Sequence, residues 1–117
     1  MKLPFDIDLK DKTAVVTGGG GVLCGMFARA LGECGAKVAV LDLNKDAADK
    51  VAEDIVKNGG CAKGYAANVL DMDIMKKVHD EVLADFGACD ILINGAGGNH
   101  PKGTTTKEYF YPEDINE

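Results

Sequence analysis

The sequence predicts an α/β fold, a doubly wound parallel sheet with its strands in the order 3-2-1-4. Two observations support this prediction. Short apolar runs rich in β-branched residues alternate with longer segments whose apolar residues recur every three or four positions, so strands alternate with helices. The strand runs are continuously apolar, which is typical of a parallel sheet covered on both faces, and right-handed crossovers give this strand order most simply.

The first strand is expected at residues 13–17. Four glycines follow it, and then a helix that Gly35 ends as a C-terminal cap. The apolar residues of this helix repeat at helical spacing, so we expect them to form its apolar face. They are Val22, Leu23, Met26, Phe27, Ala30, Leu31 and Cys34.

The other elements continue the alternation. Asn44 is a good N-cap for the second helix, which Gly59 stops, and Asp71 or Asp73 can cap the third, which Gly87 ends. The remaining strands are expected at 37–42, 61–68 and 90–94.

Composition and charge exclude several classes of function. The 117 residues are 46% hydrophobic and 27% charged, a balance typical of one globular domain. The net charge of −6 disfavours nucleic acid as a partner, and no run approaches the roughly 20 apolar residues of a membrane span. Because the first residues lack the apolar stretch of a signal peptide, we expect a cytoplasmic protein. Its four cysteines lack metal-site spacing and are expected to be small buried thiols.

The run Gly18–Gly21, between a strand and a helix, is typical of a phosphate-binding turn. Glycine lets the backbone turn sharply and approach a ligand, and the helix N-terminus directs N–H groups and a positive dipole end at it. The run is not a Walker A loop, because Met26 and Phe27 stand where that loop needs Lys and Ser or Thr. The strict Gly-x-Gly-x-x-Gly pattern is also absent, so a turn that merely packs helix against strand stays an alternative.

Asp42 ends the second expected strand, roughly twenty residues after this turn. A carboxylate at that position meets the adenosine ribose hydroxyls of NAD and repels the extra phosphate of NADP. The alternative is an exposed aspartate that helps to cap the next helix. The position therefore predicts NAD as the cofactor, with NADP disfavoured.

Four short motifs occur in order, each at the end of an expected strand: Thr17–Cys24, Asp42–Leu43, Asn68–Val69 and Asn94–Gly97. In order and placement they resemble the short-chain dehydrogenase/reductase family. That family carries Thr-Gly-x-x-x-Gly-x-Gly at the first motif and Asn-Asn-Ala-Gly at the fourth. The resemblance covers nearly the whole chain and implies a Rossmann-like, dinucleotide-binding fold.

The resemblance implies that these motifs line an NAD site. The first would hold the pyrophosphate and adenosine ribose, the second the same ribose, the third the adenine, and the fourth would run toward the nicotinamide ribose. The implied cofactor-binding residues are Gly18, Gly19, Gly20, Gly21, Val22, Leu23, Asp42, Leu43, Asn68, Val69, Asn94, Gly95, Ala96 and Gly97. Asn94 has an alternative role, tying neighbouring strands together. Val22 and Cys24 depart from the family by replacing two motif glycines, and a Cβ there could crowd the pyrophosphate.

We expect two regions along the chain. Residues 1–94 would form the dinucleotide-binding half-domain, and residues 95–117 a polar segment leading into a catalytic half beyond this chain. The start of that segment resembles the sugar-acid branch of the family, the D-mannonate oxidoreductases (fructuronate reductases). Such enzymes would interconvert a hydroxyl and a ketone on a hexonate with NAD. His100 and Lys102 could face the substrate carboxylate, although solvent-facing positions are the favoured alternative.

The family's catalytic Tyr-x-x-x-Lys pair has no match in this sequence. The residues four positions after Tyr65, Tyr109 and Tyr111 are Val69, Glu113 and Ile115. We therefore expect an enzyme fragment without activity of its own, whose bare fourth strand favours homo-oligomers. One alternative is a stand-alone nucleotide-binding or regulatory module. A receiver-type domain is disfavoured, because Asp42 has no acidic cluster around it.

Overall fold

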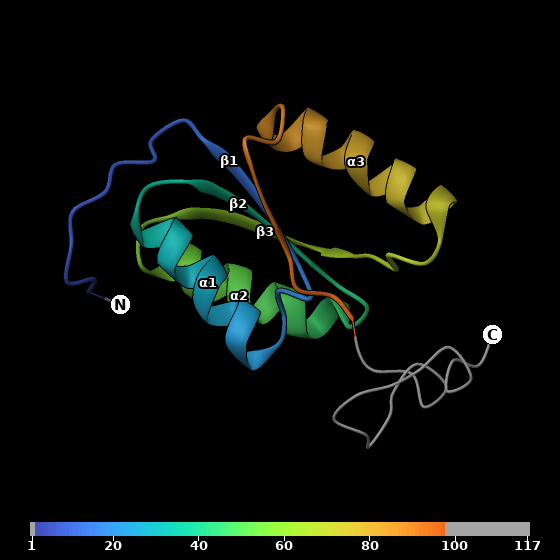
Figure 1. Ribbon diagram of the computed structural model, residues 1–117, viewed down its shortest axis with the longest axis horizontal. Helices are drawn as coiled ribbons and strands as arrows, with labels where there is room; N and C mark the ends of the chain where they lie inside the picture. Colours follow the sequence, from blue (N-terminus) through green and yellow to red (C-terminus); the bar gives the residue numbers. More distant parts are fainter. Residues whose placement is uncertain (1, 98–117) are drawn as a thin grey trace, which may run out of the picture.

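The computed structural model describes residues 2–97 and shows a parallel sheet with helices on both faces (Figure 1). The chain alternates β1 (Thr13–Thr17), α1 (Val22–Glu33), β2 (Lys37–Asp42), α2 (Lys45–Lys57), β3 (Cys61–Ala66), α3 (Met72–Phe86) and β4 (Ile91–Asn94). The strand order is β3-β2-β1-β4, which confirms the predicted fold class. The predictions for residues 98–117, including His100 and Lys102, lie outside the described residues.

Two predicted strand ends are wrong by one or two residues. β3 ends at Ala66 instead of Asn68, because the Asn68 side chain accepts a hydrogen bond from the Leu70 N–H at 3.0 Å and turns the chain toward α3. β4 begins at Ile91 instead of Asp90. The Asp90 carboxylate accepts from the Thr13 N–H at 2.9 Å, so this residue anchors the start of β1 by its side chain.

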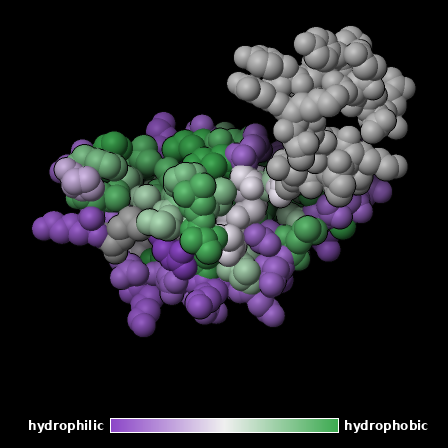
Figure 2. All heavy atoms as spheres, turned by 60° about the horizontal axis from the view of Figure 1, so that its bottom comes forward, coloured by the Kyte–Doolittle hydropathy of each residue, from purple (hydrophilic) through white to green (hydrophobic). Residues whose placement is uncertain are grey.

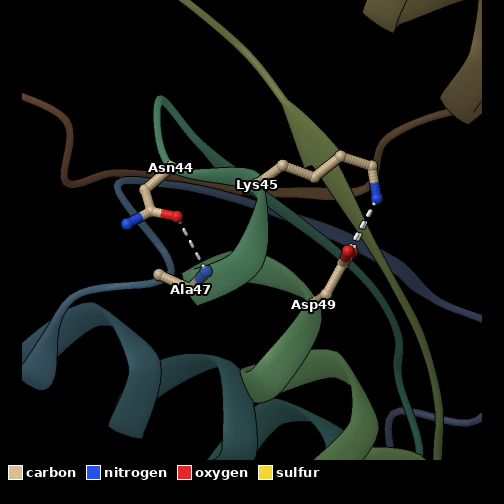
Figure 3. Close-up of polar contacts among 4 residues, drawn as sticks. All are labelled: Asn44, Lys45, Ala47 and Asp49. Atoms are coloured by element: carbon tan, nitrogen blue, oxygen red, sulfur yellow. Dashed lines mark hydrogen bonds and ion pairs between the residues drawn. The ribbon is translucent and has the colours of Figure 1, made fainter.

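Local capping sets the helix ends. The Asn44 side chain accepts from the Ala47 N–H at 3.1 Å at the start of α2, as Figure 3 shows. Asp71, the first of the two candidates, caps α3 by accepting from the N–H groups of residues 73 and 74. Gly35 and Gly87 follow helices with φ of +95° and +92°, a left-handed conformation that favours glycine.

The sheet divides the core in two. On one face α1 and α2 pack over Ala14, Val16, Val38 and Val40, which are fully buried. On the other face α3 covers Ala39, Leu41 and Tyr65 through Val78 and Val82. Successive residues of β1 and β2 thus point to opposite faces, and both faces are apolar, as a doubly covered parallel sheet requires.

The apolar face predicted for α1 packs against the core only in part, through Leu31. The fully buried residues of the helix are the small ones, Gly25, Ala28 and Gly32. Small residues are needed because α2 lies so close that a Cβ at residue 32 would come within 2.6 Å of Ile55 Cγ2. The large apolar residues left exposed are Val22 (89% exposed), Leu23 (64%), Met26 (51%) and Phe27 (41%). Figure 2 shows apolar residues gathered on this side of the molecule, with hydrophilic ones around their rim.

The cysteines are less buried than predicted. Cys24 and Cys34 are partly buried, whereas Cys61 and Cys89 are exposed. Cys61 opens the edge strand β3, and Cys89 lies in the segment between α3 and β4. Within residues 2–97 no group of three or more His, Cys, Asp or Glu could hold a metal ion, and no helix is long and apolar enough to cross a membrane.

Candidate functional site

A groove of about 490 Å³ opens at the carboxyl ends of the strands, within the size range of small-molecule sites. The chain runs outward from β1 to β3 and then returns to β4, so the order reverses between β1 and β4. Open parallel sheets bind ligands at such a reversal. The lining residues are Thr17, Gly18, Leu41, Asp42, Leu43, Ala67, Asn68, Val69, Leu70, Gly95, Ala96 and Gly97.

The glycine turn is confined between two neighbours. Gly18 has a φ of +65°, and a Cβ there would lie 2.7 Å from the carbonyl oxygen of Gly95. A Cβ on Gly20 would lie 2.8 Å from Ala47 Cβ in α2. Glycine is therefore required by close backbone contact on both sides, before any ligand is considered.

The N-terminus of α1 differs from those of the other helices. Side chains cap α2 and α3, and each of these helices has an aspartate in its first turn. α1 starts after Gly21, has no side-chain cap and has no acidic residue in its first turn. The N–H groups of this turn have no intrahelical partners, and the dipole makes this end positive. The arrangement suits an anion such as a pyrophosphate.

Asp42 holds the turn in place. Its Oδ2 accepts from the Gly20 N–H at 3.1 Å, and its Oδ1 accepts from the Asn44 N–H at 2.9 Å. The side chain borders the groove, and each carboxylate oxygen keeps acceptor capacity for another donor. A ribose diol supplies two such donors.

Apolar side chains form one wall of the groove. Leu43 follows β2, while Val69 and Leu70 follow β3. These three side chains are 75%, 44% and 92% exposed, respectively. Large apolar residues exposed beside a groove offer a surface on which a flat ring such as adenine can pack.

Thr17 ties the ends of β1 and β4 together. Its hydroxyl oxygen accepts from the Gly95 N–H at 3.0 Å and from the Ala96 N–H at 3.1 Å. In the sheet register Thr17 lies opposite Asn94. The backbone after β4 is thus fixed against the glycine turn, and both segments line the same groove.

The structure brings eight of the fourteen predicted site residues into the groove. The other six do not line it: Gly19, Gly20, Gly21, Val22, Leu23 and Asn94. Among these, Gly19 and Gly20 pack inward against β2 and α2, while Val22 and Leu23 are exposed at the start of α1. Whether any of the fourteen contacts a cofactor stays a prediction.

Four lining residues were missed by the sequence analysis: Thr17, Leu41, Ala67 and Leu70. Thr17 opens the first motif, which was a signal for its role. Leu70 follows the third motif as an apolar residue in a polar turn. Leu41 and Ala67 carried no signal, since the sequence of a buried strand end is the same whether or not a groove lies above it.

Tyr65, the one tyrosine among the described residues, is buried on the α3 face. Its hydroxyl donates to Asp85 Oδ2 at 2.6 Å. Burial and the adjacent carboxylate raise the pKa of this phenol well above its usual value. Tyr65 is therefore a structural residue and is unsuited to proton transfer in the groove.

Residues 12–115 match the family model described as short chain dehydrogenase. The chain belongs to the short-chain dehydrogenase family. An uncharacterized oxidoreductase of Haemophilus influenzae is 50% identical over 117 residues, which is 100% of this chain and 41% of that relative. A similar relative, the uncharacterized oxidoreductase UxuB of Bacillus subtilis, is 44% identical over 92% of this chain and 39% of its own length. This short-chain dehydrogenase chain thus spans about two fifths of the length of such relatives.

Solved structures show the same fold. A crystal structure from Haemophilus influenzae with bound NAD, provisionally assigned as a D-mannonate oxidoreductase, has a TM-score of 0.79 and 51% identity, covering 95% of this chain and 39% of that one. A metagenomic short-chain oxidoreductase in complex with NADP has a TM-score of 0.73 and 34% identity, covering 77% of this chain and 41% of that one. Members of the short-chain dehydrogenase family therefore bind either NAD or NADP.

Proposed function

We propose that this chain is the dinucleotide-binding part of an NAD-dependent short-chain dehydrogenase. The observation that carries the proposal is the position of Asp42, a carboxylate that borders the groove at the end of β2. There it would accept hydrogen bonds from the adenosine ribose hydroxyls of NAD, and its charge would repel the 2′-phosphate of NADP.

The groove and the helix end near it would hold different parts of a dinucleotide. The uncapped N-terminus of α1 would hold the pyrophosphate, and the apolar wall of Leu43, Val69 and Leu70 would pack on the adenine. The backbone of residues 95–97 would direct the remainder of the molecule past the end of β4. NAD, when bound, supplies the acceptor for a hydride, and these residues bind and orient it.

We further propose a hexonate sugar acid as the substrate, with the hydroxyl and ketone of D-mannonate and D-fructuronate interconverted. Two observations support this. The segment that begins at Asn94 resembles the sugar-acid branch of the family, and the Haemophilus structure at 51% identity is provisionally assigned as a D-mannonate oxidoreductase. The sequence has no Tyr-x-x-x-Lys pair, so these 117 residues alone are expected to bind cofactor without turnover.

Calorimetric titration with NADH, NADPH and ADP-ribose tests the cofactor proposal. NADH and ADP-ribose should bind with similar affinity, because the described groove holds the adenosine end of the molecule. NADPH should bind at least about tenfold more weakly, a difference of about 1.4 kcal/mol. Equal binding of NADPH and NADH would contradict the role given to Asp42.

The substrate proposal concerns an enzyme in which this chain is joined to a catalytic half, and it is tested on such an enzyme. NAD-dependent oxidation of D-mannonate is compared with that of xylitol, a polyol without a carboxylate. A higher kcat/KM for D-mannonate supports the proposal, and equal or better use of xylitol contradicts it.

A further inference from the structure

The side chain of Cys24 and the backbone of Gly95 share one tightly filled space. Cys24 lies in the first turn of α1, partly buried against the core on the α1 side of the sheet. A Cβ at residue 95 would overlap Cys24 Sγ and would lie 3.3 Å from Cys24 Cβ. It would also lie 2.8 Å from the carbonyl oxygen of Thr17. The thiol fits only because residue 95 has no side chain.

Both residues depart from the family pattern, and they do so in opposite directions. Where the first motif usually ends in glycine, this chain has a cysteine. Where the fourth motif usually has its second asparagine, this chain has a glycine. The larger and smaller side chains have changed places across one contact, which is the pattern of a volume-conserving exchange.

We propose that Cys24 is a positioning residue of the cofactor site, whose thiol takes the place of a side chain at residue 95. The proposal rests on the proposed dinucleotide binding. Cys24 Sγ lies where a Cβ on Gly95 would stand, so this side chain is directed at the backbone after β4. The departure expected to obstruct the cofactor therefore supports the groove.

The contacts around Gly95 explain how this works. Thr17 holds the N–H groups of residues 95 and 96 from the β1 side. Gly18 approaches the carbonyl oxygen of Gly95 from the turn. Cys24 fills the remaining side from α1. Together they fix the backbone after β4 against the glycine turn, the two segments between which a dinucleotide would lie.

A double-mutant cycle tests the proposal. Cys24→Ala removes only the overlapping sulfur, and Gly95→Ala adds only the missing Cβ. Each single variant and the double variant are compared with the native protein by thermal unfolding and by NADH titration. Cys34→Ala, which removes a partly buried thiol at the other end of α1, replaces Cys24→Ala in a parallel control cycle.

Gly95→Ala should lower Tm by about 5 °C or more and weaken NADH binding about tenfold. Cys24→Ala should weaken NADH binding as well, because a void is left beside Gly95. The double variant should recover about half of the Tm and about half of the NADH affinity that Gly95→Ala loses, since the sulfur no longer meets the new Cβ. Cys24→Ser, which keeps the shape of the side chain, should retain native affinity, and Cys34→Ala should recover nothing.

Strictly additive effects in the cycle would overturn the proposal. Tighter NADH binding by Cys24→Ala would also overturn it, because the thiol would then be an obstruction. Failure of the proposed function gives a different result. In that case the native protein binds no NADH. Cys24 then positions no cofactor, even if the Tm values of the cycle show that Cys24 and Gly95 interact.

Discussion

At the scale of single residues, Asp42 has a structural role as well as its proposed role in cofactor choice. Its two carboxylate oxygens accept from the N–H groups of Gly20 and Asn44, and so connect the glycine turn to the start of α2. A side chain that discriminates between cofactors is thus also one that shapes the site. Removing it changes the turn, not only the charge.

We expect Asp42→Ala to weaken NADH binding by about tenfold or more, with little gain for NADPH. The Gly20 N–H loses its acceptor, which costs about 1–3 kcal/mol if no water replaces it. Calorimetry and thermal unfolding measure both effects. Asp46→Ala, at an exposed aspartate in the first turn of α2, is the matched control and should leave NADH affinity unchanged. A clean switch to NADPH at unchanged Tm would contradict the dual role.

Two neighbouring glycines of the turn should respond differently to serine. Gly20→Ser forces a Cβ against Ala47 in α2 and should destabilise the fold by about 1–3 kcal/mol. At Gly21 a Cβ meets only the Gly18 carbonyl oxygen, at 3.3 Å, and serine there can cap α1, worth a few tenths of a kcal/mol. Chemical denaturation measures both variants. Equal destabilisation by the two serines would show that contact with α2 is not what requires glycine.

At the scale of elements, the sequence predicted the ends of the helices better than it predicted how they pack. Asn44, Asp71 and Gly35 act locally through capping, so the ends of the helices could be placed from sequence. The buried face of α1 could be placed only in part, because its closest contacts are set by the distance to α2. Gly32 packs there against Ile55, and helical spacing of large apolar residues gives no sign of such close approach.

The same limit applies to the candidate site. Its strand-end motifs were found because parallel strands bring their carboxyl ends to one edge. Thr17, the last residue of β1, lines the groove with them, and Leu70 joins them only through the turn that follows β3. The interlocked sizes of Cys24 and Gly95 depend on atomic packing, which neither motif displays alone.

The contact between β3 and Asp85 of α3 should make the stability of the fold depend on pH. The Tyr65 hydroxyl, followed by Lys63, holds the pKa of the Asp85 carboxyl below its usual value. A carboxyl whose folded pKa is lowered contributes stability above its unfolded pKa and loses it as the pH falls through the folded value. Asp85→Asn should therefore lower Tm at neutral pH, and its difference from the native protein should shrink below about pH 4.

Thermal unfolding from roughly pH 2.5 to 7, a range that spans the ordinary carboxyl pKa, measures this difference. The control is Asp80→Asn. Asp80 lies on the same helix with its side chain 82% exposed, so little effect on Tm is expected. A pH-independent loss in Asp85→Asn would mean that the lost hydrogen bond matters and the carboxylate charge does not.

At the scale of the whole molecule, the described part of the chain leaves two apolar surfaces uncovered. One is the α1 side, where Met26 and Phe27 are exposed. The other is a groove of about 220 Å³ between α3 and β4, lined mainly by apolar residues that include Val82, Leu83 and Leu92. Within residues 2–97, β4 pairs only with β1, so one of its edges has no strand beside it. Apolar surface next to an open strand edge favours association.

We expect the 117-residue polypeptide, purified alone, to self-associate through the β4 side at concentrations on the order of tens of micromolar. Leu92, 56% exposed on β4, lines this surface, and Leu92→Lys should lower the mass measured by light scattering after size exclusion. Val56→Lys changes a similarly exposed residue on α2 (53%) and should leave the mass unchanged. A native polypeptide that stays monomeric would contradict the expectation. If neither variant abolishes association, the contact lies elsewhere, and the exposed residues of α1 are the next to substitute.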